Sequence, residues 1–241
     1  DRHASDLLTI LANEFNVPLA SLQSVLTTLL DGDHGQLPPS ANEALQQVRH
    51  THDRLGRVVA DLVDLYRLDH EQLPVSVSSI ELHELLDRAE HTVEAECTRK
   101  GLTLSRQGND SFRITTDPQL ATRLLMVVLD NAVRYTEQSA VTMTCAAQGQ
   151  QIVVTVRDTG AGIAPDRSPT LFQPPQPGTL LHGRGMSLWV ARRLAKTIGS
   201  DLVLVSSELH RGSTFAVTFP RASRRAAPDG ASAASMSAHT T

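Results

Sequence analysis

The sequence predicts a helical hairpin followed by an α+β sandwich, and three observations support this fold class. Over residues 1–70, apolar side chains recur at steps of three and four with a single break, as on the buried face of a helix. Over residues 71–220, helical segments are mixed with short alternating segments, without the strict βα alternation of a parallel sheet. Residues 221–241 are rich in Ala and Ser, and we expect them to form a disordered tail.

The hairpin is predicted from two helical segments on either side of residues 31–39, where Gly and Pro interrupt the pattern. Ser40 with Glu43 three residues later would form a capping box at the start of the second helix. Two apolar stripes of this length cannot bury each other completely in one hairpin. Dimerisation into a four-helix bundle is the economical solution; the alternative is packing against the rest of the same chain.

The sandwich is predicted from three helices and seven short strands. Asp117 and Pro118 would provide the N-cap and the first position of the central helix. The helices are expected over residues 80–100, 117–135 and 186–198. The strands are expected over residues 75–77, 102–104, 112–114, 141–145, 152–157, 202–205 and 214–219.

The composition excludes several classes of function. A net charge of −4 and 3% aromatic residues give neither a basic surface nor a stacking platform for nucleic acid. Cys97 and Cys145 form neither a metal-ligand pattern nor a disulfide framework. The longest strictly apolar run, residues 124–129, falls far short of the roughly 20 residues that span a bilayer. We expect a cytoplasmic chain and, since it begins without Met inside a predicted helix, a piece of a longer protein.

Three separate segments together predict a nucleotide site, although each alone also fits a plain turn or a surface amide. The first, LDNAVRY at 129–135, ends the central helix. Asn131 can offer an amide oxygen to a hard cation, Arg134 can neutralise phosphate, and Tyr135 can lie against a base.

The second segment, DTGAGI at 158–163, follows a strand. Asp158 can accept from an exocyclic amine, while Gly160 and Gly162 allow the backbone to approach a ligand. The third segment opens the last helix, where glycines before a helix N-terminus form a phosphate cradle. Its candidate residues are Gly183, Arg184 and Gly185.

With these motifs the chain resembles the catalytic core of sensor histidine kinases over residues 1–220. The similar motifs are the N box (131–136), the first glycine box (158–163), the F box (171–174), the second glycine box (183–188) and the closing strand motif (212–215). The resemblance implies an ATP-binding domain of the histidine kinase/gyrase type, with Asp158 on the adenine amine, Asn131 on Mg²⁺ and residues 164–182 as a mobile lid.

For residues 1–70, the resemblance implies the dimerisation and phosphotransfer hairpin. It also implies that this hairpin belongs to a longer sensor, which can be anchored in a membrane. The partners implied are a second copy or a related kinase in a homodimer or heterodimer, and a response regulator. No nucleic acid is expected.

The phosphotransfer motif departs from the family. NEFNVPL at 13–19 stands where the family has His-Glu-x-x-Thr/Asn-Pro-Leu, so Asn13 occupies the phosphoacceptor position. Phosphorylation needs a nitrogen with a free lone pair, and the amide lone pair of Asn13 is delocalised into its carbonyl. Glu14, the would-be general base, then has no partner, and Val17 cannot hold water for dephosphorylation.

The nucleotide motifs also depart from the family. Val127 stands where related ATPases keep a catalytic Glu, which argues against an independent ATPase. Ser187 replaces a usual third glycine and would crowd the phosphates. An engineered His-to-Asn change would explain Asn13 but none of the other departures, so we favour natural divergence.

Three hypotheses remain open for the function. The leading one is a degenerate sensor histidine kinase core that binds Mg-ATP without autophosphorylation. The alternatives are an active kinase that phosphorylates a histidine on a partner chain, and a dimeric scaffold that does not need nucleotide.

Overall fold

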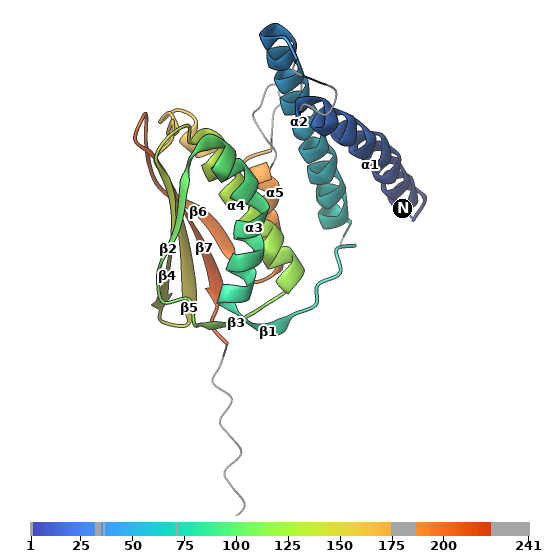
Figure 1. Cartoon of the computed structure of the whole chain (residues 1–241). Coiled ribbons are helices and arrows are strands. Elements are labelled where there is room, and N and C mark those ends of the chain that lie inside the picture. Colours follow the sequence, from blue (N-terminus) through green and yellow to red (C-terminus); the bar gives the residue numbers. More distant parts are fainter. Residues whose placement is uncertain (1, 32–34, 36, 71, 175–186, 223–241) are drawn as a thin grey trace, which may run out of the picture.

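The computed structural model describes residues 2–31, 35, 37–70, 72–174 and 187–222. Figure 1 shows a two-helix hairpin beside a layer of helices on a sheet. The phosphate cradle at 183–185, the second half of the expected lid and residues 223–241 of the expected tail lie outside the described residues. Disorder from residue 221 is wrong for the first two residues of that tail, because Arg221 forms a β-bridge with Ile114 and the N–H of Ala222 donates to the carbonyl of Arg113. The described side chains exclude those of residues 2–13 and Asn16.

The predicted hairpin is confirmed. Helices α1 (Arg2–Leu30) and α2 (Pro39–Asp69) run antiparallel, and the ring of His52 donates to the carbonyl of Leu19 over 2.7 Å. No helix within the described residues combines the length and the apolar character needed to cross a membrane.

The capping box at the start of α2 is wrong. The helix begins at Pro39, its N-cap is Pro38, and no side chain caps it. Because Pro39 has no backbone N–H and its ring sets a helical φ, it starts the helix one residue before Ser40. Ser40 therefore lies inside the helix, out of position to pair with Glu43 as a cap.

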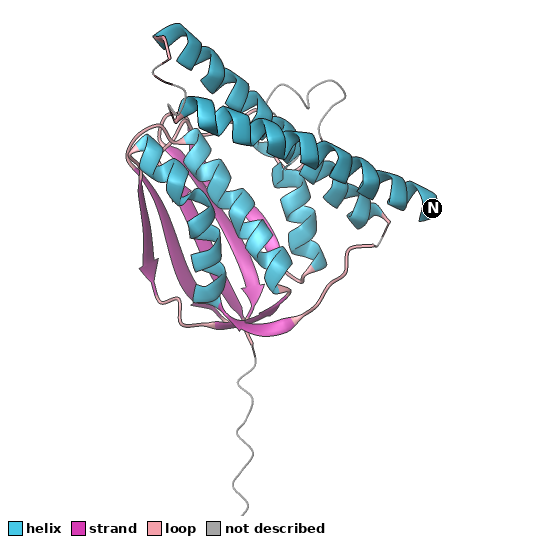
Figure 2. Cartoon of the chain, turned by 45° about the vertical axis from the view of Figure 1, so that its right-hand side comes forward, coloured by secondary structure: helices cyan, strands magenta, loops and turns pink. Residues whose placement is uncertain are grey.

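The sandwich is confirmed, with helices on one face of a five-stranded sheet (Figure 2). Strands β2 and β4 pair in parallel, and all other neighbours are antiparallel. The strand order is β2 (Thr103–Gly108), β4 (Ala140–Gln148), β5 (Gln151–Asp158), β7 (Gly212–Pro220) and β6 (Asp201–Glu208). The helices are α3 (Leu82–Lys100), α4 (Pro118–Tyr135) and α5 (Ser187–Thr197). We call the region from Ser78 to Pro220 the sandwich domain.

The expected strand at 75–77 is wrong. Those residues are irregular and exposed, and pairing starts at Ser78 in β1 (Ser78–Glu81), which pairs with β3 (Arg113–Thr116) as a separate two-stranded sheet. Ile80, expected at the start of a helix, is buried in β1 opposite Ile114. Pairing with β3 delays the helix to Leu82.

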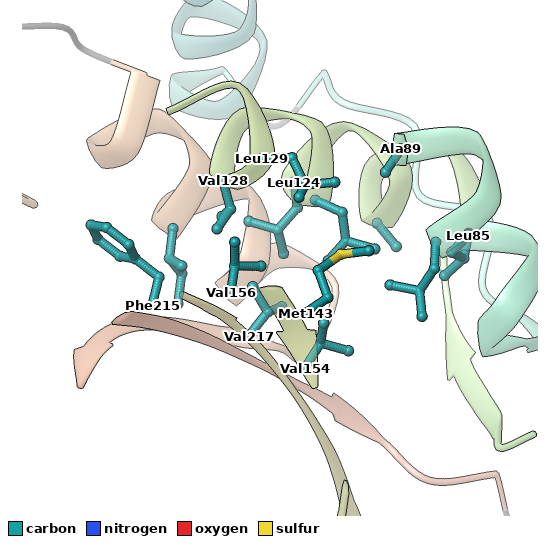
Figure 3. Packing of buried hydrophobic residues seen from close by; sticks show 14 of the residues in the cluster. Leu85, Ala89, Leu124, Val128, Leu129, Met143, Val154, Val156, Phe215 and Val217 are labelled. Atoms are coloured by element: carbon teal, nitrogen blue, oxygen red, sulfur yellow. The ribbon is translucent and has the colours of Figure 1, made fainter. Parts of the chain in front are cut away.

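The core lies between α3, α4 and the inner face of the sheet. In Figure 3, Leu124 and Val128 of α4 face Met143, Val156 and Val217 of the strands. Five α4 residues have no exposed surface: Ala121, Leu124, Leu125, Val128 and Leu129. This packing holds α4 rigidly on the sheet, and with it the candidate residues of its last turns.

Candidate functional site

Both ends of α4 are fixed by specific side chains. The predicted cap is confirmed: Asp117 accepts from the backbone N–H groups of Gln119 and Leu120. At the other end, the ammonium of Lys100 donates to three backbone carbonyls at 2.9–3.1 Å. The negative end of the helix dipole also stabilises a cation at this position. The acceptors are Val133, Arg134 and Thr136.

The last turns of α4 carry the first group of candidate residues. The Asn131 Nδ2 donates to the carbonyl of Val127 over 2.9 Å, which orients the amide. Its Oδ1, the atom that a hard cation prefers, accepts no hydrogen bond among the described residues. The guanidinium of Arg134 lies 5.7 Å from the ring centre of Tyr135, which is 49% exposed.

Asp158 is the buried anion of the site. It ends β5 with 4% of its surface exposed, and its Oδ1 accepts from the backbone N–H groups of Gly160 (2.9 Å) and Ser213 (3.2 Å). Burial raises the pKa of the Asp158 carboxyl, against the lowering effect of these two bonds. Its Oδ2 accepts no hydrogen bond among the described residues, and so remains available to a donor such as an amine.

The two glycines after Asp158 are required by close contacts within the chain. A Cβ on Gly160 would lie 2.1 Å from the carbonyl oxygen of Tyr135, and one on Gly162 (φ +69°) would lie 2.0 Å from that of Glu208. The N–H of Ala161 also donates to Tyr135. These glycines therefore bring the loop after β5 against the end of α4 and the β6–β7 turn.

Gly212 belongs to the closing strand motif at 212–215, but the sequence analysis gave it no role at the site. Its φ is +98°, and a Cβ there would lie 2.0 Å from the backbone oxygen of Asp158. The adjacent Ser213 N–H binds the Asp158 carboxylate. The Gly-Ser-Thr-Phe run was the available signal, but its role depends on a contact between strands far apart in sequence.

The structure thus joins two of the three predicted segments. Tyr135, Asp158, Gly160 and Gly162 meet through the contacts above, and Asn131 lies one turn before Tyr135. The third segment, Gly183, Arg184 and Gly185, lies outside the described residues.

The phosphotransfer candidates lie on α1. The backbone of Asn13 is helical, but its side chain lies outside the described part of the chain. Glu14 is exposed, and Val17 is 70% exposed.

Phe172 of the expected F box is tied to α5. The guanidinium of Arg192 lies 4.9 Å from its ring centre, beside a groove of about 450 Å³. Carboxylates already pair the basic side chains of this groove: Asp201 binds Arg192 and Lys196, and Asp69 binds Arg193.

Comparisons with known proteins match both parts of the chain. A family model described as histidine kinase-, DNA gyrase B-, and HSP90-like ATPase matches residues 116–223. A model of the His Kinase A (phospho-acceptor) domain matches residues 3–71.

Among relatives, the sensor protein SrrB of Staphylococcus aureus strain MRSA252 is 26% identical over 227 residues, and that of strain N315 is 25% identical. Both alignments cover 92% of this chain, which spans 39% of the length of either relative.

Solved structures share the fold. Full-length ShkA in complex with AMPPNP superposes with a TM-score of 0.65 at 24% identity, over 90% of this chain and 46% of ShkA. The histidine kinase AdeS of Acinetobacter baumannii has a TM-score of 0.59 at 19% identity, over 86% of this chain and 96% of AdeS.

Proposed function

We propose that this chain, which is homologous to sensor histidine kinases and carries their phospho-acceptor and ATPase domains, binds Mg-ATP but does not phosphorylate itself. In two-component signal transduction, it would pass on a conformational change in place of a phosphoryl group. The observation that carries the proposal is Asn13 at the acceptor position, in a chain whose Asn131 and Asp158 side chains each keep an oxygen free to bind a ligand among the described residues.

The arrangement of α4 and the loop after β5 supports nucleotide binding. The free Oδ2 of buried Asp158 would accept from the adenine amine, and burial strengthens such a bond. The free Oδ1 of Asn131, oriented by its bond to Val127, would hold Mg²⁺. Arg134 lies one turn further and would neutralise phosphate charge. Mg-ATP would supply the transferable phosphoryl group.

The chemistry of α1 supports the loss of autophosphorylation. An amide at position 13 offers no basic nitrogen to the phosphorus atom. The exposed carboxylate of Glu14 has no imidazole proton to accept. Val17, also exposed, cannot orient the water that dephosphorylation of a partner requires.

The outer faces of the hairpin support dimerisation. Large apolar side chains remain 40–70% exposed along both helices, which is unfavourable unless another surface covers them. A second hairpin, from another copy or from a related kinase, would bury them in a four-helix bundle. The exposed residues are Phe15, Val17, Leu22 and Val25 on α1, and Val48, Leu55 and Leu62 on α2. A response regulator would be a further partner of the hairpin.

The test of nucleotide binding is calorimetric titration of the full chain with Mg-ATP and Mg-ADP. We expect micromolar affinity for the wild type, loss of binding in Asn131→Ala and no change in Asn42→Ala, a matched amide removal on the exposed side of α2. Absence of binding at millimolar nucleotide would favour the scaffold.

The test of phosphotransfer is incubation with γ-labelled ATP. We expect no label on the chain, and stoichiometric phosphohistidine would contradict the proposal. Mixing with a catalytically dead relative that keeps its histidine tests the remaining alternative, because a live kinase domain would label that partner.

A further inference from the structure

Helix α2 packs against the sandwich domain of its own chain. Leu65 and Leu68 of α2 contact a small apolar cluster built on Val190 and Leu194 of α5, to which Trp189 also contributes. Part of the apolar surface of α2 is therefore buried within the chain. This agrees with the alternative to dimerisation given above, in which the hairpin packs against the rest of the same chain.

Three carboxylates fix this contact. Asp61 accepts from the hydroxyl of Ser187 over 2.7 Å, and Asp64 pairs with Arg123 at 2.5 Å. Asp69 forms the third link, with Arg193 at 2.6 Å. We call Asp61, Asp64 and Asp69 the acidic face of α2.

Two of these carboxylates are buried. Asp61 is 7% exposed and Asp64 is 2% exposed. A buried carboxylate is unfavourable unless partners compensate its lost hydration. Asp64 has a guanidinium as its partner, whereas the one hydrogen-bond donor to Asp61 among the described residues is the hydroxyl of Ser187.

Ser187 gives this contact its significance, because it is the first residue of α5. A helix N-terminus carries partial positive charge and favours an anion. The carboxylate of Asp61 supplies an anion there from 126 residues away in sequence. The proposed function brings nucleotide phosphates to the same end of α5, since Gly183 and Gly185 immediately precede it.

We infer that the carboxylate of Asp61 competes with the nucleotide phosphates for the N-terminus of α5, so that docking of α2 and nucleotide binding oppose each other. The inference rests on the proposed function and adds its regulation. Two anions at one helix end repel each other, and the competition is reciprocal: docking weakens nucleotide binding, and nucleotide weakens docking by the same factor.

The inference also explains why a serine stands at position 187. Its hydroxyl provides the hydrogen bond that keeps Asp61 at the helix end, which a glycine could not do. The departure that the sequence analysis interpreted as crowding of the phosphates thus provides an interdomain contact.

The test compares Mg-ADP affinity, by calorimetry on the full chain, between the wild type and Asp61→Asn. The amide has nearly the same shape but no charge. We expect Asp61→Asn to bind Mg-ADP at least fivefold more tightly, the lower range of typical coupling between sites. Glu43→Gln, which removes a charge from an exposed part of α2, should leave the affinity unchanged.

A second readout follows docking directly. Trp189, the one tryptophan of the chain, lies in the interface cluster, so its emission should shift to the red when α2 leaves. We expect that shift when Mg-ADP is added to the wild type. Ser187→Ala, which removes the hydrogen bond to Asp61, should shift the emission without nucleotide.

The outcomes separate the two proposals. Equal Mg-ADP affinities in the wild type and Asp61→Asn overturn the competition but leave nucleotide binding in place. An unchanged Trp189 emission at saturating Mg-ADP also overturns it. No binding heat in either protein overturns nucleotide binding itself, and the competition with it.

Discussion

Acidification from pH 7 to pH 5 is expected to tighten the docking of α2 on the sandwich domain. In the docked chain, burial raises the pKa of Asp61 from its ordinary 3.8 to about 6. The neighbouring carboxylate of Asp64 acts in the same direction, whereas the Ser187 hydroxyl and the cations Arg123 and Arg57 oppose it. When α2 leaves, water solvates the carboxyl again and its pKa returns towards the ordinary value.

The sign follows from proton binding. The docked chain holds the Asp61 proton more tightly than the undocked chain, so docking takes up a proton between about pH 4 and pH 6. With pKa values of 3.8 and about 6, the docking constant at pH 5 is about tenfold larger than at pH 7, or about 1.3 kcal/mol. Little change is expected above pH 7, where the carboxyl is ionised in both states.

The assay is the red shift of Trp189 emission during a urea titration, which reports undocking, at pH 7 and at pH 5. Circular dichroism in the same samples shows whether the helices and the sheet stay folded. The undocking midpoint should rise in acid for the wild type. In Asp61→Asn, the tenfold acid effect on the docking constant should be lost. A smaller rise in the undocking midpoint should remain, because burial also raises the pKa of Asp64. An equal acid effect in both proteins, or easier undocking in acid, would refute the reasoning.

Three further substitutions test the site. Gly162→Ala places a Cβ 2.0 Å from the carbonyl oxygen of Glu208 at positive φ and should lower the free energy of unfolding by about 3 kcal/mol in urea denaturation. Lys100→Met removes three hydrogen bonds to the end of α4 and should cost about 1.5–3 kcal/mol in the same assay. Asp158→Asn keeps an acceptor for the Gly160 N–H but loses the charge, so calorimetry should show Mg-ADP affinity lowered about tenfold with unfolding unchanged.

The chain offers matched controls for the first two. Gly149 has a similar φ of +60° with nothing near its Cβ position, so Gly149→Ala should show the backbone strain alone, about 1 kcal/mol. Equal losses at 149 and 162 would contradict the steric argument. Lys196 pairs with Asp201 on the surface, and Lys196→Met should cost less than about 1 kcal/mol.

Periodicity predicted the fold well where one buried face dominates. The apolar steps of α4 and the Asp117–Pro118 start predicted its bounds to within one residue, because cap chemistry and burial are local. The strand predicted at residues 75–77 is wrong because alternation alone does not say whether a partner strand exists. The partner β3 aligns with residues 78–81 instead, and that register depends on contacts more than thirty residues apart.

The candidate site was predictable as a set of residue types, but its internal geometry was not. Asp158 could be selected because it follows a strand and precedes glycines. That Gly160 packs on Tyr135, and that Gly212 packs on Asp158 itself, follows only from how three segments converge. For the same reason, Lys100 gave no sequence signal: its acceptors are carbonyls 33–36 residues away.

Taken together, the two proposals explain why Asn13 and Ser187, which both depart from the family motifs, occur in one chain. A kinase that phosphorylates its own hairpin must bring the nucleotide to α1, so a contact that holds the sandwich domain on α2 would slow it. With Asn13 at the acceptor position, that movement has no phosphoryl group to deliver, and a carboxylate at the start of α5 no longer costs catalysis. Nucleotide would then act as a ligand that releases α2. Restoring the acceptor alone, by Asn13→His, should therefore give little phosphohistidine. Combining it with Ser187→Ala, which removes the hydrogen bond to Asp61 and weakens docking, should give more; equal labelling of the single and double variants would contradict this link.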